Sequence, residues 1–416
     1  MISRIMRILH TADWHLGDRL GRIDRTLELR KAVERVGDYC RSENIDVLLV
    51  AGDLFSELAR PDGLRETIEH WQCVFRDFLS AGGTILALTG NHDNENFCRT
   101  LTHAMNLAAP TAGGVGDLVP AGRLYLATEP TLLRLRDRRE SFDVQFILMP
   151  YPTPSRYLRD EASQKYSSPE EKNQKLMTAF LGALRTIQRH ERFDRVCPTI
   201  LSAHVNVHGA TIGASLFRLA EQNDVVIPAD GLPTEFAYVA LGHVHKPQAL
   251  GGREHVRYSG SIERMDLGES ADAKSVVVFD VGPKGLREAP RLLPLAATPI
   301  YEIDIRTPSV DLPALRERYA DAATDLVNLH VTYTAGVDSL EEVLRDAEQI
   351  FPRYYTRDWT ESGALGAALM PGEGSSQGKG FEETVREYVR CELTNYTDAE
   401  QAEILGRLET LFGEES

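Results

Sequence analysis

The sequence lacks long hydrophobic runs and has few cysteines, and both absences exclude classes of protein. No apolar stretch approaches the roughly 18 residues of a membrane span, so we expect no membrane contact. The five cysteines are scattered and never spaced CxxC, which argues against a disulfide framework or a thiolate zinc site. This pattern and the absence of a secretory signal predict a cytoplasmic protein, with Met6 as an alternative start to Met1.

The chain also has fewer basic than acidic residues, with 46 Lys and Arg against 62 Asp and Glu. A net charge of -16 taken alone speaks against a nucleic-acid partner, because polyanions bind basic surfaces. The deficit lies at the end of the chain, since residues 301–416 hold 10 Lys and Arg against 24 Asp and Glu, whereas residues 1–300 hold 36 against 38. Composition therefore leaves the partner of the first 300 residues open.

The length of 416 residues suggests two or three domains. We predict a main domain at 1–296, a small α/β module at 297–360, a flexible linker at 361–380 and two amphipathic helices within 381–416. The small module is expected to contain strands at 300–305 and 326–333 and helices at 312–323 and 340–350. The linker is rich in Gly and Ser and cannot pack a core. The terminal helices either fold back onto the main domain or, as we favour, dock in a groove of another protein.

Short apolar runs in the main domain repeatedly stop at polar residues, and helical patterns often follow. This alternation predicts a layered α/β sheet with functional loops at the strand ends. Between the first two runs, Leu29, Val33, Val36 and Cys40 have helical spacing, which predicts a β–α–β unit. The five runs are residues 8–9, 47–50, 84–88, 199–201 and 238–241.

Residue types that bind metal ions follow each of these five runs. Singly, each has an ordinary explanation, because Asp caps helices and the residues of GNHD favour turns. As an ordered set at the edge of one sheet, oxygen and imidazole ligands without thiolates predict a hydrolytic metal site, and we expect Gly52, Gly90 and Gly242 to allow tight turns beside them. The candidates are Asp13 and His15 in TADWHLG, Asp53 in VAGDLF, Asn91, His92 and Asp93 in LTGNHDN, His204 in LSAHVNVHG, and His243 and His245 in LGHVHKP.

Together these motifs resemble the calcineurin-like metallophosphoesterases and, more closely, the SbcD and Mre-eleven family of DNA-repair nucleases. The resemblance covers the whole chain and is strong to about residue 281. It implies a layered β-sandwich flanked by helices (α/β), with a small α/β cap domain and a C-terminal helical tail. The motifs that carry it are HTADWHLG (10–17), GDLF followed by Arg60-Pro61, GNHD (90–93), MPYP (149–152), GHVHKPQ (242–248) and YSGSIERMDLGE (258–269).

The resemblance also implies an activity and partners. The activity is 3′→5′ exonuclease and single-strand or hairpin endonuclease action on DNA during double-strand-break processing. The partners are DNA, a second copy of the chain, and an SbcC-type coiled-coil ATPase bound through residues 381–412. The two copies form a homodimer, which becomes a heterotetramer with the ATPase.

Site residues carry over from the family by motif position. Two Mn²⁺ ions, with Mg²⁺ or another divalent metal as the alternative, would share Asp53. Asp13, His15 and His245 would complete one site, and Asn91, His204 and His243 the other. His92 would steady the transition-state phosphate or protonate the leaving oxygen. Asp93 either orients that imidazole or only shapes the turn, and Arg60, Lys246 and Arg264 are candidates for contact with DNA phosphates.

One position departs from the family pattern. Many relatives carry a second catalytic histidine three residues after the bridging Asp, and Ser56 stands there in this chain. Serine cannot shuttle a proton near neutral pH as histidine can, so the balance of exonuclease and endonuclease action stays open. Two other functions share the same metal core: another calcineurin-like phosphodiesterase or phosphatase, and a scaffold that mainly tethers DNA ends. GNHD rather than GNHE counts against a phosphatase, and the complete ligand set counts against a pure scaffold.

Overall fold

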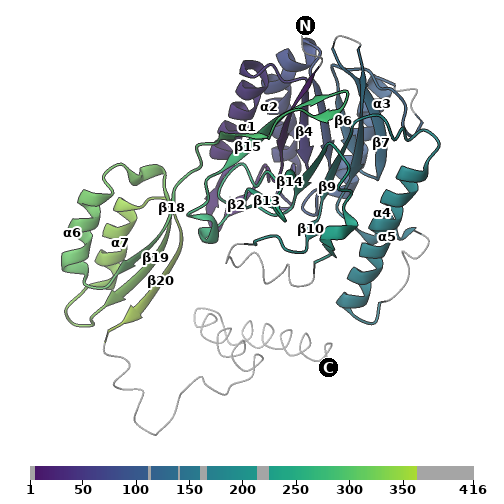
Figure 1. Cartoon of the computed structure of the whole chain (residues 1–416). Helices are drawn as coiled ribbons and strands as arrows, with labels where there is room; N and C mark the ends of the chain where they lie inside the picture. Colours follow the sequence, from purple (N-terminus) through teal and green to yellow (C-terminus); the bar gives the residue numbers. More distant parts are fainter. Residues whose placement is uncertain (1–4, 111–113, 139–140, 160–165, 213–223, 363–416) are drawn as a thin grey trace, which may run out of the picture. The chain divides into compact units, whose positions relative to one another are not determined.

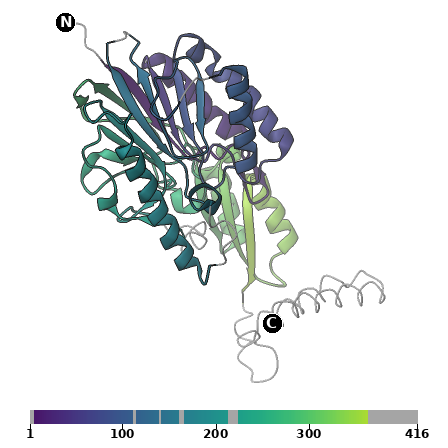
Figure 2. The ribbon, with the colours of Figure 1, turned by 90° about the vertical axis from the view of Figure 1, so that its right-hand side faces the viewer.

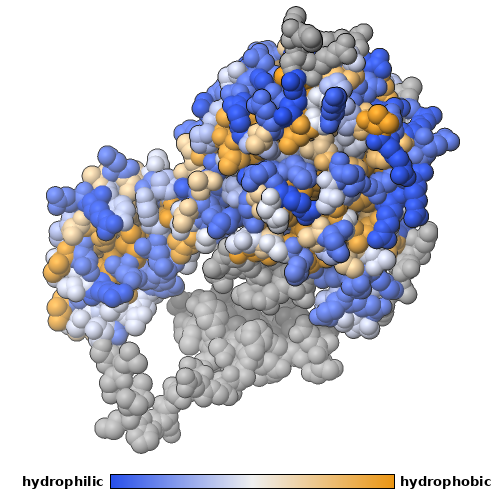
Figure 3. All heavy atoms as spheres, viewed as in Figure 1, coloured by the Kyte–Doolittle hydropathy of each residue, from blue (hydrophilic) through white to orange (hydrophobic). Residues whose placement is uncertain are grey.

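The computed structural model describes residues 5–362, apart from 111–113, 139–140, 160–165 and 213–223 (Figure 1). Most of the linker predicted at 361–380 and both predicted C-terminal helices lie outside the described residues. Within the described part, no helix has the length and apolarity needed to cross a membrane. The face seen in Figure 3 is mostly hydrophilic, with hydrophobic residues in scattered patches.

Two stacked β-sheets form the main domain, and both are built largely from the apolar runs. The first sheet has the order β16 (Gly285–Leu286), β15 (Ser275–Gly282), β1 (Met6–Thr11), β4 (Val47–Ala51), β5 (Thr84–Leu88) and β6 (Leu124–Ala127), with β17 (Arg291–Pro294) also paired to β15. The second has the order β13 (Gln248–Leu250), β14 (Arg253–Tyr258), β12 (Tyr238–Gly242), β9 (Thr199–His204), β8 (Asp143–Met149) and β7 (Thr131–Arg136). All five predicted strands are therefore confirmed, but they belong to two sheets, and the expectation of one sheet was wrong.

Helices cover the outer faces of this sandwich. Figures 1 and 2 show α1 (Thr26–Ser42) and α2 (Pro61–Ser80) on one side of the sheets and α5 (Pro169–Arg189) on the other. Further elements of the main domain are α3 (Glu95–Ala108), α4 (Pro154–Tyr157), the short strands β2 (Arg19–Leu20), β3 (Ile23–Asp24), β10 (Asn206–Val207) and β11 (Val226–Ile227), and the 3-10 turns η4 (Ala229–Gly231) and η5 (Leu267–Glu269). The order helix, sheet, sheet, helix confirms the layered sandwich.

Alternation along the strands explains why the runs are almost entirely apolar. In β4, Leu48 packs with the residues of α1 and α2, while its neighbours Val47 and Leu49 pack between the sheets with Phe146 of β8. Successive side chains of a strand point to opposite faces, so a strand covered on both faces must be apolar at every position. The same periodicity cannot tell which of two buried sheets a run will join.

The predicted β–α–β unit is confirmed, because α1 connects β1 and β4 and these strands pair in parallel. Leu29, Val33, Val36 and Cys40 are all buried along one face of α1. Their spacing of three or four residues matches the helical turn and turns that face toward the sheet.

A small sheet of order β18 (Ile300–Ile305), β19 (Leu326–Tyr333) and β20 (Tyr354–Glu361) follows, and it has its own apolar core with α6 (Pro308–Arg318) and α7 (Leu340–Ile350). A 3-10 turn, η6 (Ala322–Thr324), precedes β19. Both predicted strands and the second helix are confirmed. The first helix begins at Pro308, where proline suits a first helical turn, and ends five residues earlier than predicted. Strand β20 was not predicted, and its side chains are mostly exposed. The domain boundaries stay predictions.

Candidate metal centre

The strand ends of both sheets converge and bring together all seven predicted metal ligands. Asp13 and His15 follow β1, Asp53 follows β4, and Asn91 follows β5. His204 ends β9, while His243 and His245 follow β12 in the second sheet. The backbone N–H groups of Asp13 and His15 donate to the carbonyl oxygens of Gly52 and Asp53, both at 3.0 Å, which ties two of the loops together. Their role as ligands stays a prediction that this convergence supports.

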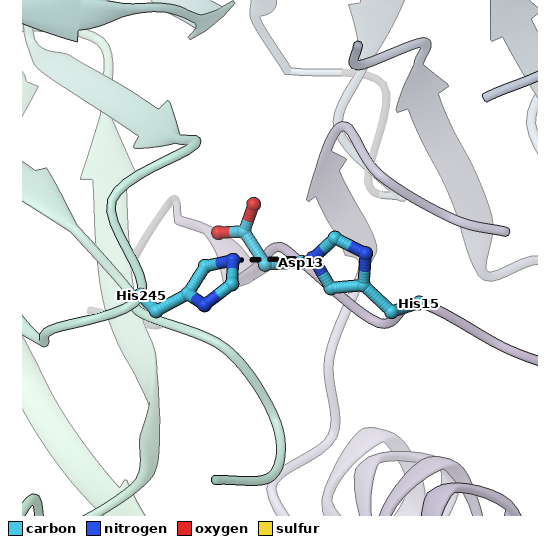
Figure 4. A group of neighbouring side chains, drawn as sticks. All are labelled: Asp13, His15 and His245. Carbon is cyan, nitrogen blue, oxygen red and sulfur yellow. Dashed lines mark hydrogen bonds between the residues drawn. The ribbon is translucent and has the colours of Figure 1, made fainter. Parts of the chain in front are cut away.

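One set of ligand atoms surrounds His15. Its Nε2 lies 3.1 Å from Nε2 of His245 and 3.8 Å from Oδ2 of Asp53. Figure 4 shows the two imidazoles turned toward one another with the Asp13 carboxylate beside them, and one ligand atom of each of these three residues lies within 4.8 Å of the others. Atoms bound about 2.1 Å from one ion lie roughly 3 Å apart, so this spacing suits a common cation.

A second set adjoins the first through Asp53. Nε2 of His204 lies 3.1 Å from Oδ2 of Asp53 and 3.0 Å from Oδ1 of Asn91. The same Asn91 oxygen lies 2.9 Å from Nδ1 of His243. The Oδ2 atom of Asp53 therefore faces histidines of both sets, as a carboxylate bridging two cations would.

Backbone strain is concentrated at this centre. Among the described residues, positive φ angles outside glycine occur at Asp13 (56°), His15 (44°), Asp53 (51°), His243 (97°) and only one residue elsewhere, Asn44. Such conformations cost about 1–3 kcal/mol each and persist only where the surroundings enforce them. The fold thus holds four candidate ligands at a cost in stability, which is typical of a functional site.

At two of the three predicted glycines, neighbouring atoms leave no room for a side chain, and the backbone does not make a glycine-specific turn. Gly52 has φ +94° and does turn in the left-handed region, as expected. Gly90 and Gly242 have no such angle, but a Cβ at Gly90 would lie 2.0 Å from Oδ1 of Asp53, and one at Gly242 would lie 1.9 Å from the Ala51 carbonyl oxygen. The two sheets at Gly242, and two neighbouring loops of the first sheet at Gly90, can approach this closely only without a side chain.

Replacing Gly242 by Ala is therefore expected to lower the free energy of unfolding by about 3 kcal/mol, because the backbone must move to relieve overpacking. Gly182 of α5 is a matched control, since a Cβ there meets nothing within 4 Å. Gly182→Ala should instead stabilise by about 1 kcal/mol through helix propensity. Urea unfolding of the metal-free protein measures both changes, and equal effects of the two substitutions would contradict the crowding at Gly242.

Burial and mutual charge set the protonation of the centre without metal. Burial would raise the pKa of Asp53, but the neighbouring histidines, His204 first, outweigh it and hold the pKa well below its ordinary value. Burial depresses the pKa of His15, which leaves its ring neutral. Burial also opposes protonation of His245, yet Glu269 outweighs it and raises the pKa of His245 to about 9. Asp53 and His15 are thus ready to bind cations, whereas binding at His245 would displace a proton.

The two predicted catalytic residues occupy different surroundings. His92 is only half-buried, its ring centroid lies 5.0 Å from that of His15, and its backbone N–H donates to Oδ1 of Asp53 at 2.9 Å. Asp93 is buried and accepts backbone N–H bonds from Phe55 at 2.8 Å and Gly90 at 2.7 Å. Burial, followed by the charge of Asp53, raises the pKa of Asp93 to about 7. These bonds support the turn-shaping alternative for Asp93, while a catalytic part for either residue stays a prediction.

The three residues predicted to contact DNA differ in whether their charged groups already bind other parts of the protein. Arg60 is exposed at the start of α2, and Lys246 lies 3.9 Å from Asp272. Nη1 of Arg264 donates to the backbone carbonyls of Ala297 and Thr298, and Nη2 donates to that of Asp272, so the fold already uses both terminal nitrogens. Arg264 is accordingly the weakest of the three predictions, and none of them is tested by the structure.

Ser56 and two carboxylates complete the surroundings of the centre. Ser56 is buried, and its hydroxyl donates to Oδ1 of Asp18 at 2.9 Å. Asp224 and Glu269, which were not predicted as site residues, contact His243 and His245 at 2.6 and 2.7 Å. Glu269 ends the motif YSGSIERMDLGE (258–269), which offered a signal in the sequence, whereas Asp224 stands in no motif.

Comparisons with known proteins agree with this geometry. A family model described as calcineurin-like phosphoesterase matches residues 6–247. The chain is similar to the SbcD component of the SbcCD nuclease from Rhodobacter capsulatus, at 32% identity over 302 residues that cover 70% of this chain and 69% of that protein. It is 30% identical to the corresponding protein of Bacillus subtilis over 67% of each chain. The corresponding protein of Escherichia coli K12 is 29% identical over 67% of this chain and 66% of that protein.

Among solved structures, a dimetal phosphatase from Danio rerio matches with a TM-score of 0.37 and 9% identity, covering 71% of this chain and all of that one. A likeness this distant says nothing about substrate.

Proposed function

Because the chain belongs to the calcineurin-like phosphoesterases and, within them, to the SbcD nucleases, we propose that its metal centre hydrolyses DNA phosphodiester bonds with two divalent cations, Mn²⁺ first among them. The observation that carries the proposal is the convergence of oxygen and imidazole ligands in two adjoining sets around Asp53. This donor set fits the group, because imidazole, carboxylate and amide oxygen without thiolate suit Mn, Fe, Zn or Mg. One set is Asp13, His15, Asp53 and His245, and the other is Asp53, Asn91, His204 and His243.

The protein's own groups would divide the remaining work. Two bound cations supply Lewis-acid polarisation of the phosphate and a water of lowered pKa. Asp53 contributes the negative charge shared by both sets, and its depressed pKa supports the ionised form. His92, half-buried beside His15, is our candidate for contact with the transition-state phosphate or for protonation of the leaving 3′ oxygen.

We extend the proposal to the kind of cleavage and to the partners. Cleavage would be 3′→5′ exonucleolytic and endonucleolytic on single strands or hairpins, within a cytoplasmic heterotetramer of two copies of this chain and two copies of an SbcC-type coiled-coil ATPase. The relatives are named as subunits of a nuclease, which supports at least one further subunit. Residues 381–412 would dock the ATPase. Since residues 1–300 have almost no net charge, most of the affinity for DNA would come from dimerisation and from the ATPase.

Chelation separates this function from its alternatives. Purified full-length protein, with and without the ATPase, is assayed on end-labelled duplex and hairpin DNA. We expect EDTA to abolish cleavage and added Mn²⁺ to restore it, because the cations provide the nucleophile and the charge stabilisation. A phosphomonoester substrate assayed in parallel is the control. Chelator-resistant cleavage, or turnover of the phosphomonoester with DNA left intact, would contradict the proposal.

A further inference from the structure

Two buried carboxylates lie behind the candidate ligands, one in each set. Oδ2 of Asp224 lies 2.6 Å from Nε2 of His243, and Oε1 of Glu269 lies 2.7 Å from Nδ1 of His245. The side chains of Asp224 and Glu269 are 3% and 6% exposed. Both therefore hold a histidine in surroundings from which water is nearly excluded.

Each carboxylate contacts the ring nitrogen that faces away from the metal centre. The other nitrogen of His243, Nδ1, lies 2.9 Å from Oδ1 of Asn91, and the other nitrogen of His245, Nε2, lies 3.1 Å from Nε2 of His15. An acceptor on the outer nitrogen favours a proton there, so in the singly protonated ring that binds a cation the lone pair of the inner nitrogen is directed at the centre. The carboxylates thus select both the tautomer and the orientation of the two rings.

The carboxylates are themselves held in place by different means. Oδ1 of Asp224 accepts from the Tyr151 hydroxyl and the backbone N–H of Val225, both at 2.7 Å. Oε2 of Glu269 accepts from Nζ of Lys274 at 2.6 Å, and this fully buried lysine also donates to the His245 carbonyl oxygen at 2.9 Å. Neither carboxylate can turn away from its histidine without breaking these bonds.

The remaining histidine of the second set provides a contrast. Nδ1 of His204 lies 2.7 Å from the backbone carbonyl oxygen of Ala51, a neutral partner. We propose that Asp224 and Glu269 are positioning residues, Asp224 for the cation held by His243 and Glu269 for the cation held by His245, so that the two cation sites can be weakened independently. The inference rests on the two-cation centre of the proposed function.

Metal titration tests this independence without relying on nuclease activity. The full-length protein and its variants are titrated with Mn²⁺, and free Mn²⁺ is followed by electron paramagnetic resonance. Asp224→Asn should weaken one of two sites about 10- to 100-fold, the usual effect of removing such a partner. Glu269→Gln alone would leave the buried Lys274 with Asp272, at 3.9 Å, as its remaining carboxylate partner, so the test uses the double substitution Glu269→Gln with Lys274→Met. That variant should weaken the other site to the same degree, and all three substitutions together should weaken both.

The control and the contrary outcomes are equally definite. Glu254→Gln removes an exposed carboxylate that pairs with Arg257, and it should leave both sites unchanged. Unfolding midpoints without metal report any purely structural loss. Suppose that the wild type binds two Mn²⁺ ions, and that the variants lose stability but change neither Mn²⁺ affinity by more than about twofold. This result would overturn the positioning role and keep the proposed function. Weakening of the same site by both variants would overturn the assignment of one carboxylate to each cation, and a wild type that binds no Mn²⁺ would overturn both proposals.

Discussion

Replacing Asp53 by Asn is expected to lower Mn²⁺-dependent DNA cleavage about ten-thousand-fold, since each cation supplies several kcal/mol of charge stabilisation and each 1.4 kcal/mol is tenfold in rate. Oδ2 of Asp53 lies 3.8 Å from Nε2 of His15 and 3.1 Å from Nε2 of His204, so one substitution affects both ligand sets. The amide has nearly the same shape but no charge to offer either cation. Single-turnover cleavage of end-labelled duplex DNA measures the rate, and Mn²⁺ titration of the same samples measures occupancy.

A matched control for Asp53 is Asp280→Asn. Asp280 lies on β15, pairs with Arg7 at 2.8 Å and is 28% exposed. Its substitution by Asn therefore removes a carboxylate charge of the same kind, but away from the metal centre. We expect cleavage within about twofold of wild type, because a single exposed ion pair contributes about 1 kcal/mol or less to stability. Asp53→Asn protein that binds two Mn²⁺ ions normally and cleaves DNA normally would show that Asp53 does not bridge the cations.

The ligands could be predicted from sequence because each follows within a few residues of a mostly apolar run. Such a run is buried on both faces, and its polar successor must then lie at a sheet edge. Val47 to Ala51 and then Asp53 show this most simply. What the runs do not encode is their partner strand, since Val239 of β12 and Leu48 of β4 are equally buried yet lie in different sheets.

The missed features have in common that they depend on tertiary contacts. β20 consists of mostly exposed residues and forms through pairing with β19, so its YYTRDWTE carries little hydrophobic signal. Asp224 contacts His243 across 19 residues of chain, and a lone aspartate before a short strand has many ordinary explanations. Support for the turn-shaping alternative of Asp93 comes only from the structure, in which its two oxygens accept from Phe55 and Gly90.

His92→Gln is expected to reduce cleavage about a thousand-fold, within the range for loss of a general acid or base, while Mn²⁺ binding is retained. The backbone N–H of His92, rather than its ring, bonds Asp53, and any side chain leaves that bond intact. The ring is 16% exposed, so it can reach a bound phosphate. Single-turnover rates at saturating Mn²⁺ measure the loss, with His208→Gln, an exposed histidine beside β10, as the control expected to cleave normally.

The competing role for His92 is that of a ligand, because a ring nitrogen of His92 lies within 4.8 Å of ligand atoms of both His15 and Asp53. The two roles separate in the same titration. If His92 acts on the substrate, the variant binds two Mn²⁺ ions with wild-type affinity and cleavage stays low however much Mn²⁺ is added. If it is a ligand, occupancy falls and excess Mn²⁺ restores cleavage. Restoration of this kind would contradict the catalytic assignment and transfer His92 to the set formed by His15 and Asp53.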